Sequence, residues 1–156
     1  MDWKNMLVSA DAVLERIRPG MSVLLSTGAA EPRTLVKRLM AAHSANLQDL
    51  ELIQIVSFAD AISLENLQSQ KFRLKTFFSG WVADEAITAG HVDLIPCYLS
   101  RIPELLEMRK IRVDIVFVQI TPPDKDGYSS LGVSVDVARL AMEQANIVVG
   151  EINTLI

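Results

Sequence analysis

Short runs of apolar residues alternate along the chain with segments in which apolar residues recur every three or four positions. Several of the runs are apolar at consecutive positions, as expected of parallel strands covered on both faces. They predict strands at Met21–Leu25, Leu50–Val56, Phe72–Phe77, Val92–Ile95, Val113–Ile120 and Ile147–Ile152. The helical spacing between them predicts helices at Ala10–Ile17, Arg33–Ala45, Trp81–Ala89, Ile102–Arg109 and Val135–Ala145.

This alternation of strands and helices predicts an α/β fold with a mostly parallel open sheet flanked by helices on both faces. Crossovers of one hand bring the loops that follow the strands to one edge of such a sheet, where open α/β sheets bind ligands. The 156 residues suffice for one domain with its own core, and no repeat, low-complexity tract or linker divides them. We therefore expect a single domain over residues 1–156.

The composition limits the possible partners and cellular location of this domain. Apolar residues make up 50% of the chain, which favours a sheet covered on both faces or a surface that meets another domain or subunit. The net charge is −4 and basic residues form no cluster, so nucleic acid is not an expected partner. The single Cys97 excludes an internal disulfide. Because no signal peptide and no membrane-spanning apolar run is evident, we expect a cytoplasmic protein without a membrane partner.

Several kinds of site find no support in the motifs. His43, His91 and Cys97 do not have the spacing of a metal site, so we expect no metal. Neither a dinucleotide-binding G-x-G-x-x-G nor a phosphate-binding G-x-x-x-x-G-K-[ST] sequence occurs. Gly132–Asp136 is close to the G-x-S-x-G motif of serine hydrolases, but Asp136 replaces the second glycine and both histidines precede Ser134. A serine hydrolase is therefore not expected.

The first candidate ligand loop is Gly28–Pro32, between a predicted strand and a predicted helix. Gly28 can adopt backbone angles closed to other residues, and the alanines after it leave the main chain accessible. Pro32 suits a first helical turn, where free amides would attract a carbonyl, carboxylate or phosphate oxygen and Glu31 would interact favourably with the helix dipole. From the residues alone, an ordinary tight turn is the simpler interpretation, and a ligand loop is the alternative.

The second candidate loop is Thr121–Asp136, the longest irregular stretch of the chain. Its Pro, Asp and Gly residues favour turns, and Ser134 is expected to cap the helix that follows, with Asp136 in the first turn. Long loops after the strands of an α/β sheet often bind ligands. The residues alone leave open whether this loop is a connection or a binding loop.

The two loops, in this order and separation, resemble the acetyl-CoA hydrolase/transferase family. The run Val113–Ile120, the turn Thr121–Tyr128 and the segment Ser130–Asp136 are similar to the family's strand, its "S-P-P-D-x-x-G-Y" turn and its "S-L-G-x-S-V-D" helix start. Thr121 stands where Ser is frequent. Gly28–Pro32 is similar to the family's small-residue loop that ends in Glu-Pro, and the resemblance covers nearly the whole chain.

The resemblance implies an enzyme with two α/β halves, in which this chain is the amino-terminal half and the carboxy-terminal catalytic half is absent. Such an enzyme transfers coenzyme A between an acyl-CoA and a small carboxylate of the acetate, butyrate or 4-hydroxybutyrate class. A glutamate of the other half attacks the thioester, which leads to a glutamyl-CoA intermediate, so no catalytic residue is expected in this chain. It also implies coenzyme A thioester as substrate rather than a permanently bound cofactor. Because half of the residues are apolar and a partner domain is missing, we expect a homo-oligomer. The substrate-binding residues that it implies here are Gly28, Ala29, Ala30, Glu31, Pro32, Gly132 and Ser134.

Two other functions remain open. One is a non-enzymatic module that binds an acyl-CoA or a protein partner. The other keeps the family and makes the reaction hydrolysis, with water in place of the acceptor carboxylate. In either case the chain would keep the same two loops.

Overall fold

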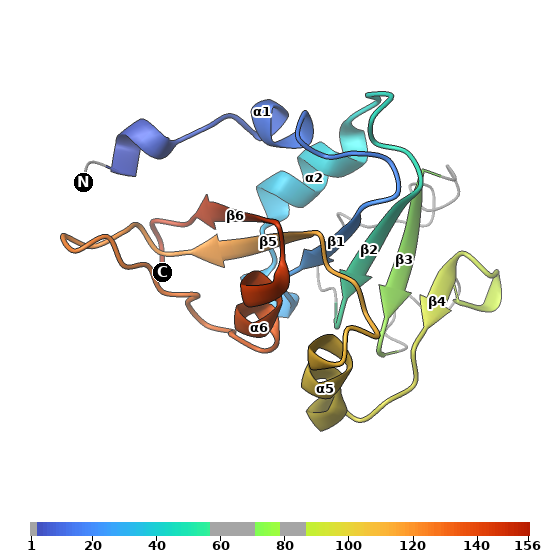
Figure 1. Ribbon diagram of the computed structural model, residues 1–156. Helices are drawn as coiled ribbons and strands as arrows, with labels where there is room; N and C mark the ends of the chain where they lie inside the picture. Colours follow the sequence, from blue (N-terminus) through green and yellow to red (C-terminus); the bar gives the residue numbers. More distant parts are fainter. Residues whose placement is uncertain (1–2, 57–70, 79–86) are drawn as a thin grey trace.

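The computed structural model describes residues 3–56, 71–78 and 87–156. Within these residues, six parallel strands form one open sheet in the order β4-β3-β2-β1-β5-β6 (Figure 1). The strands are β1 (Ser22–Leu25), β2 (Leu50–Gln54), β3 (Phe72–Thr76), β4 (Val92–Leu94), β5 (Ile115–Ile120) and β6 (Ile147–Ile152). All six lie within the predicted strands, and the predicted α/β class with a parallel open sheet is confirmed.

Helices cover both faces of the sheet. Helices α1 (Ala10–Leu14) and α2 (Arg33–Ala41) pack on one face, and α5 (Ile102–Glu107) and α6 (Ala138–Gln144) pack on the other (Figure 1). Short 3₁₀ helices lie at η1 (Trp3–Met6), η2 (Gly28–Ala30) and η3 (Leu99–Arg101). No helix of the described segments is long and apolar enough to cross a membrane.

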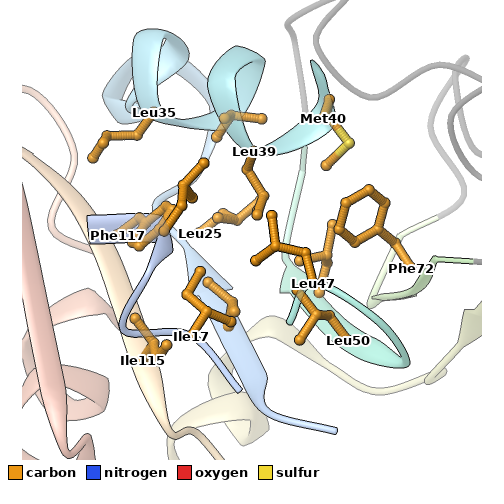
Figure 2. Packing of buried hydrophobic residues seen from close by; sticks show 14 of the residues in the cluster. Ile17, Leu25, Leu35, Leu39, Met40, Leu47, Leu50, Phe72, Ile115 and Phe117 are labelled. Carbon is orange, nitrogen blue, oxygen red and sulfur yellow. The ribbon is translucent and has the colours of Figure 1, made fainter. Parts of the chain in front are cut away.

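The core follows from the two-residue period of the strands. Val23 and Leu25 face α1 and α2, whereas Leu24 between them faces α5 and α6. On the first side, Leu39 of α2 lies against the sheet close to Phe117 of β5, and both side chains are fully buried (Figure 2). Burial of one such side chain contributes about 1.5–3 kcal/mol. Both faces of the central strands β1, β2 and β5 are therefore largely buried in the core, which leaves their ends for function.

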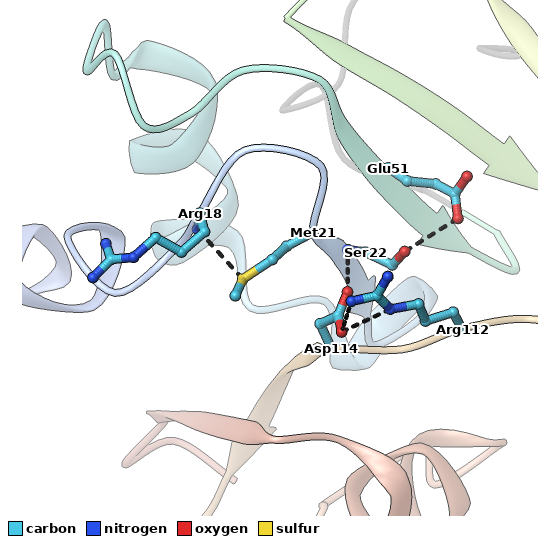
Figure 3. A network of polar contacts seen from close by, with 6 residues as sticks. All are labelled: Arg18, Met21, Ser22, Glu51, Arg112 and Asp114. Atoms are coloured by element: carbon cyan, nitrogen blue, oxygen red, sulfur yellow. Dashed lines mark hydrogen bonds and ion pairs between the residues drawn. The ribbon is translucent and has the colours of Figure 1, made fainter.

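The amino edge of the sheet is occupied by a polar network (Figure 3). The buried Asp114 accepts hydrogen bonds from the backbone N–H of Ser22 (3.0 Å) and from Arg112 Nε (2.9 Å). Ser22 Oγ donates to Glu51 (3.2 Å), whose other oxygen pairs with Lys75 Nζ. This network connects β1, β2 and β3 to Asp114, just before β5, and gives the buried Asp114 carboxylate its partners. The polar network thus stabilises the amino edge of the sheet. The carboxyl edge is the one where a ligand can bind.

The helices are shorter than the sequence predicts. The predicted helix Arg33–Ala45 ends at Ala41, and Asn46 beyond it donates hydrogen bonds to the carbonyl oxygens of Leu14 and Ile17 (2.9 Å each). These bonds satisfy carbonyls at the end of α1, so tertiary contacts override the helical pattern. Most of the predicted helix Trp81–Ala89 lies outside the described residues.

Candidate ligand site at the carboxyl edge of the sheet

The order of the strands reverses between β1 and β5. The chain runs outward from β1 to β4 and then returns to place β5 on the other side of β1. At such a switch point the connections diverge and leave a crevice at the carboxyl ends of the strands, where α/β sheets bind ligands. The two candidate loops follow β1 and β5, so they start at this point.

The loop after β1 is held tightly from its first residue. Ser26 N–H donates to the carbonyl of Phe117 in β5 (3.0 Å), and Gly28 N–H donates to the carbonyl of Val56 beyond β2 (3.0 Å). Gly28 has φ +59°, the left-handed region that favours glycine, and it opens the 3₁₀ turn η2. Within residues 28–32 only Ala29 is exposed. The loop therefore presents Ala29 and its peptide groups at the edge of the sheet.

Glu31 is buried and lies outside the helix that follows. Its side chain is 1% exposed and accepts a hydrogen bond from Gln54 Nε2 at the end of β2 (2.9 Å). Its carbonyl oxygen accepts from Gln119 Nε2 of β5 (3.5 Å). The prediction that Glu31 is a first-turn acid of the helix is wrong, because its backbone is extended (ψ 126°) and α2 begins at Arg33. Glu31 instead connects the loop to the sheet.

The first amides of α2 are already bonded. Glu151, from β6, accepts hydrogen bonds from the N–H groups of Thr34 (3.3 Å) and Leu35 (2.8 Å). The prediction that free amides at this helix start attract a ligand oxygen is therefore wrong for these two groups. A carboxylate from another strand replaces the usual capping side chain, which Pro32 cannot supply.

The loop after β5 is a closed hairpin-like turn. Thr121 N–H donates to the carbonyl of Ser130 (2.9 Å), and Ser130 N–H donates to Thr121 Oγ1 (2.9 Å), which closes its base. At the tip, Asp124 Oδ1 accepts from the N–H groups of Asp126 and Tyr128 (2.9 Å each). The Pro-Pro-Asp and Gly-Tyr residues therefore shape the turn, which presents an exposed Tyr128.

The loop then passes through Gly132 and Ser134 to α6. Gly132 has φ +73°, and a Cβ there would lie 2.7 Å from Ile156 Cδ1, so its close neighbour is the end of the described chain. Ser134 is half-buried but does not cap the helix, because α6 begins only at Ala138. The predicted cap is wrong: Asp136, at φ +34°, accepts the N–H of Ala138 (2.9 Å) instead.

Asp136 also joins the two loops. Its carboxyl group lies close to Thr27, just before Gly28, whose backbone and side chain favour the charged form of Asp136. Although the residue as a whole is exposed, its carboxyl group packs inward, and this burial raises its pKa above the ordinary value despite the effect of Thr27. The Thr27–Asp136 contact places Gly28–Pro32 and the end of the second loop at one edge of the sheet, as predicted.

Sequence reasoning missed Gln54, Gln119, Thr27 and Glu151. Gln54 and Gln119 did leave a signal, since each is an uncharged polar residue inside a predicted strand that is otherwise largely apolar. A polar group in that position is expected to have a hydrogen-bond partner. Glu151 left none, because its partners Thr34 and Leu35 are more than a hundred residues away.

The chemistry of this edge is that of a binding surface. A narrow apolar pocket opens there, with Thr27 and Gln54 as its polar lining and Ile53, Phe77 and Val137 among its apolar walls. Across the described segments, no group of three or more His, Cys, Asp or Glu residues is arranged to hold a metal ion. The pocket has a volume of about 10 Å³, room for about one water molecule, so the exposed part of this edge is Ala29 with its peptide groups.

Comparisons with known proteins identify the family of this chain. The family model for the acetyl-CoA hydrolase/transferase N-terminal domain matches residues 1–156. The chain is 30% identical to the 4-hydroxybutyrate coenzyme A transferase of Clostridium kluyveri over 98% of its length and 36% of the relative's. It is 34% identical to the succinyl-CoA:acetate/propanoyl-CoA:succinate CoA transferase of Fasciola hepatica, over 93% of its length and 30% of the relative's.

A solved structure shows the same fold. The chain superposes on a 4-hydroxybutyrate CoA-transferase from Porphyromonas gingivalis with a TM-score of 0.70 and 24% identity, over 98% of this chain and 35% of that one. The chain thus spans about a third of the length of the relatives it matches.

The strand order defines a doubly wound α/β domain with both candidate loops at the carboxyl edge of the sheet, the edge at which such folds bind ligands. With the family model matched over residues 1–156, the chain belongs to the acetyl-CoA hydrolase/transferase family and corresponds to its N-terminal domain.

Proposed function

We propose that these residues are the amino-terminal domain of a CoA-transferase, which transfers coenzyme A between an acyl-CoA and a small carboxylate. The observation that carries the proposal is the match of the whole chain to the family's N-terminal domain, together with 30% and 34% identity to two named CoA transferases. The substrate class that we propose is acetate, butyrate and 4-hydroxybutyrate. The protein would act as a cytoplasmic homo-oligomer.

The catalytic carboxylate, in this proposal, belongs to a second domain outside residues 1–156. That glutamate attacks the thioester carbonyl and expels CoA thiolate, which forms an acyl–glutamyl anhydride. The thiolate then attacks the glutamyl carbonyl and releases the first carboxylate, which leaves a glutamyl-CoA thioester for the acceptor to resolve. Glu31 does not fit this role, because its side chain is 1% exposed and is engaged by Gln54.

The amino-terminal domain contributes one wall of the active site. We assign this wall to Gly28–Pro32 with Gly132 and Ser134, and Ala29 is its exposed centre. Small side chains there let the acyl group or the thioester approach the backbone closely. Coenzyme A enters as a substrate, and the proposal requires no resident cofactor.

A trapping experiment on the full-length protein tests the mechanism. Incubation with acyl-CoA, followed by borohydride or hydroxylamine, should modify one glutamate, and peptide mapping should place it beyond residue 156. A modified residue within residues 1–156 would contradict the assignment of the nucleophile. Release of free CoA in the absence of any acceptor carboxylate would identify a hydrolase instead. Binding of acyl-CoA without adduct, transfer or hydrolysis would identify a binding module.

A further inference from the structure

Glu31 and Gln54 form a buried pair next to the proposed active-site wall. Their side chains are 1% and 2% exposed, and Gln54 Nε2 lies 2.9 Å from Glu31 Oε2. Carboxyl groups are rarely buried this completely without a specific role, because removal of a carboxylate from water costs roughly several kcal/mol. Neither the core nor the proposed covalent steps explain the pair.

The orientation of Gln54 shows that the amide serves the carboxylate. Its Oε1 is buried and has no hydrogen-bond partner among residues 3–56, 71–78 and 87–156. An unsatisfied buried acceptor is unfavourable, yet the amide keeps its N–H group on Glu31. A hydrogen bond to a carboxylate is stronger than one to a neutral group, so the bond to Glu31 determines the orientation of the Gln54 amide.

The pair connects the loop to the strand that borders it. Gln54 ends β2, and two residues further the carbonyl of Val56 accepts the N–H of Gly28 (3.0 Å). Glu31 closes the other end of the same turn, because its N–H donates to the carbonyl of Gly28 (3.1 Å). The 3₁₀ turn that exposes Ala29 is therefore held at both ends against β2.

We infer that Glu31 is a positioning residue, whose buried carboxylate, held by Gln54, fixes the Gly28–Ala30 turn so that the peptide groups around Ala29 face the reacting acyl group. The inference rests on the proposed transferase function. It assigns Glu31 a hydrogen-bonding role and no part in bond making. An amide in its place would therefore preserve what Glu31 does.

Substitutions of Glu31 in the full-length protein test this role by kinetics. Glu31→Gln keeps an acceptor for Gln54 Nε2 and should retain kcat within about threefold of wild type, since the neutral bond is only moderately weaker. Glu31→Ala removes the acceptor and should lower kcat by roughly 10- to 100-fold, the effect of a misplaced active-site group. Glu107→Gln, an exposed carboxylate on α5, is the matched control and should be unchanged. A loss in Glu31→Gln equal to that in Glu31→Ala would overturn the inference, because it would show that the charge itself is required.

A residue swap keeps the test valid if Glu31→Ala fails to fold. Gln54→Glu alone puts two carboxylates side by side and should lower kcat, whereas adding Glu31→Gln restores one carboxylate and one amide. The double variant should recover at least about tenfold over Gln54→Glu, which is the coupling expected of residues in contact. A double variant no better than the single one would contradict the inference.

Amide exchange separates this inference from the proposed function. In Glu31→Ala the backbone N–H groups of Gly28 and of position 31 should exchange about tenfold faster or more than in wild type, while that of Leu24 in β1 stays protected. If the wild-type protein transfers no CoA, the proposed transferase function is wrong, but this measurement still tests whether the Glu31–Gln54 pair holds the turn. Unchanged exchange at Gly28 and position 31 would overturn the inference, whatever the activity.

Discussion

At the scale of single residues, Gly28 should be sensitive because its backbone and its position both matter. It has φ +59° and is buried at the start of the turn that presents Ala29. Gly28→Val would force a β-branched side chain into the left-handed region, which costs roughly 1–3 kcal/mol, and would displace the turn. We expect turnover of the full-length protein to fall at least about tenfold.

Gly20 is the matched control for this change. It has φ +75° with nothing within 4 Å of an added Cβ, and it precedes β1 at the opposite edge of the sheet. Gly20→Val should show a similar loss of thermal stability but near-normal turnover below its Tm. Equal losses of turnover in both variants would indicate that strain alone, rather than the location of Gly28, explains the effect.

Asp136 gives a prediction about pH. Burial raises the pKa of its carboxyl group in the folded protein, so the folded state binds the proton more tightly than the unfolded state. The corresponding stability is present below the unfolded pKa, near 3.8, and is lost as pH rises through the folded pKa. Asp136→Asn keeps an acceptor for Ala138 N–H and tolerates φ +34°, so it should be more stable than wild type at pH 7.

The stability difference between Asp136→Asn and wild type should shrink as pH falls through the folded pKa of Asp136 and level off below the unfolded pKa near 3.8, measured by urea unfolding across the pH range. Asp136→Ala is the comparison variant: it also removes the titrating group but loses the bond to Ala138, so it should be less stable than Asp136→Asn by roughly 1–2 kcal/mol at every pH. A constant difference between the Asn variant and wild type would show that Asp136 does not titrate differently in the folded state.

Single residues also show why the candidate site was only partly predictable. Gly28 and the turn residues of 121–130 act through their own backbone, so local sequence was enough to find them. Glu31 and Ser134 were assigned wrong roles. The partner of Glu31 is Gln54 of another element, and a local turn at Asp136 delays the start of the helix beyond Ser134. Local sequence contains no information about which distant strand end lies beside a loop.

At the scale of elements, α2 depends on a cap that comes from β6. Glu151 accepts from Thr34 and Leu35 and adds a negative charge at the positive end of the helix dipole. Glu151→Ala should lower the free energy of unfolding by about 1 kcal/mol, and Glu151→Gln by less, because the amide oxygen still accepts a hydrogen bond. Chemical denaturation measures both values.

The control for this prediction is Glu143→Ala on α6. Glu143 pairs with Arg139 on the helix surface at 3.3 Å, an exposed interaction that contributes at most about 0.5 kcal/mol. If Glu151→Ala and Glu143→Ala lower the free energy of unfolding equally, the bonds from Glu151 to α2 contribute no more than a surface ion pair.

The elements themselves were predicted well where burial dictates their pattern. The strands stand out because β1, β2 and β5 are buried on both faces and require apolar residues at nearly every position. Helix ends were less predictable. Helix α2 ends at Ala41, and Asn46 beyond it bonds to α1 and Ile17 instead of continuing the helix. Helix α6 begins only after the turn at Asp136. The order of the strands in the sheet, β4-β3-β2-β1-β5-β6, could not be predicted from the apolar pattern of any single strand.

At the scale of the whole molecule, apolar surface remains outside the core. Met6, Leu7 and Val8 are consecutive and 68%, 58% and 61% exposed, and Tyr98, Leu99 and Met108 are exposed near α5. Such clusters mark surfaces that meet a domain or a subunit. We expect residues 1–156 alone to self-associate in light scattering and the full-length protein to form a defined oligomer. A monodisperse monomer of the full-length protein would contradict the oligomer.

We propose above all that residues 1–156 supply one wall of the active site of a CoA-transferase and contain no catalytic nucleophile. Covalent catalysis is lost when its nucleophile is absent, rather than weakened. The most direct test measures the incorporation of labelled acetate into acyl-CoA, with butyryl-CoA or succinyl-CoA as donor. The full-length protein and residues 1–156 are compared at equal concentration.

The account predicts incorporation by the full-length protein and none above background by residues 1–156, with circular dichroism confirming that the shorter chain is folded. Robust incorporation by residues 1–156 that is abolished by Glu31→Gln would contradict it, and would make Glu31 the nucleophile.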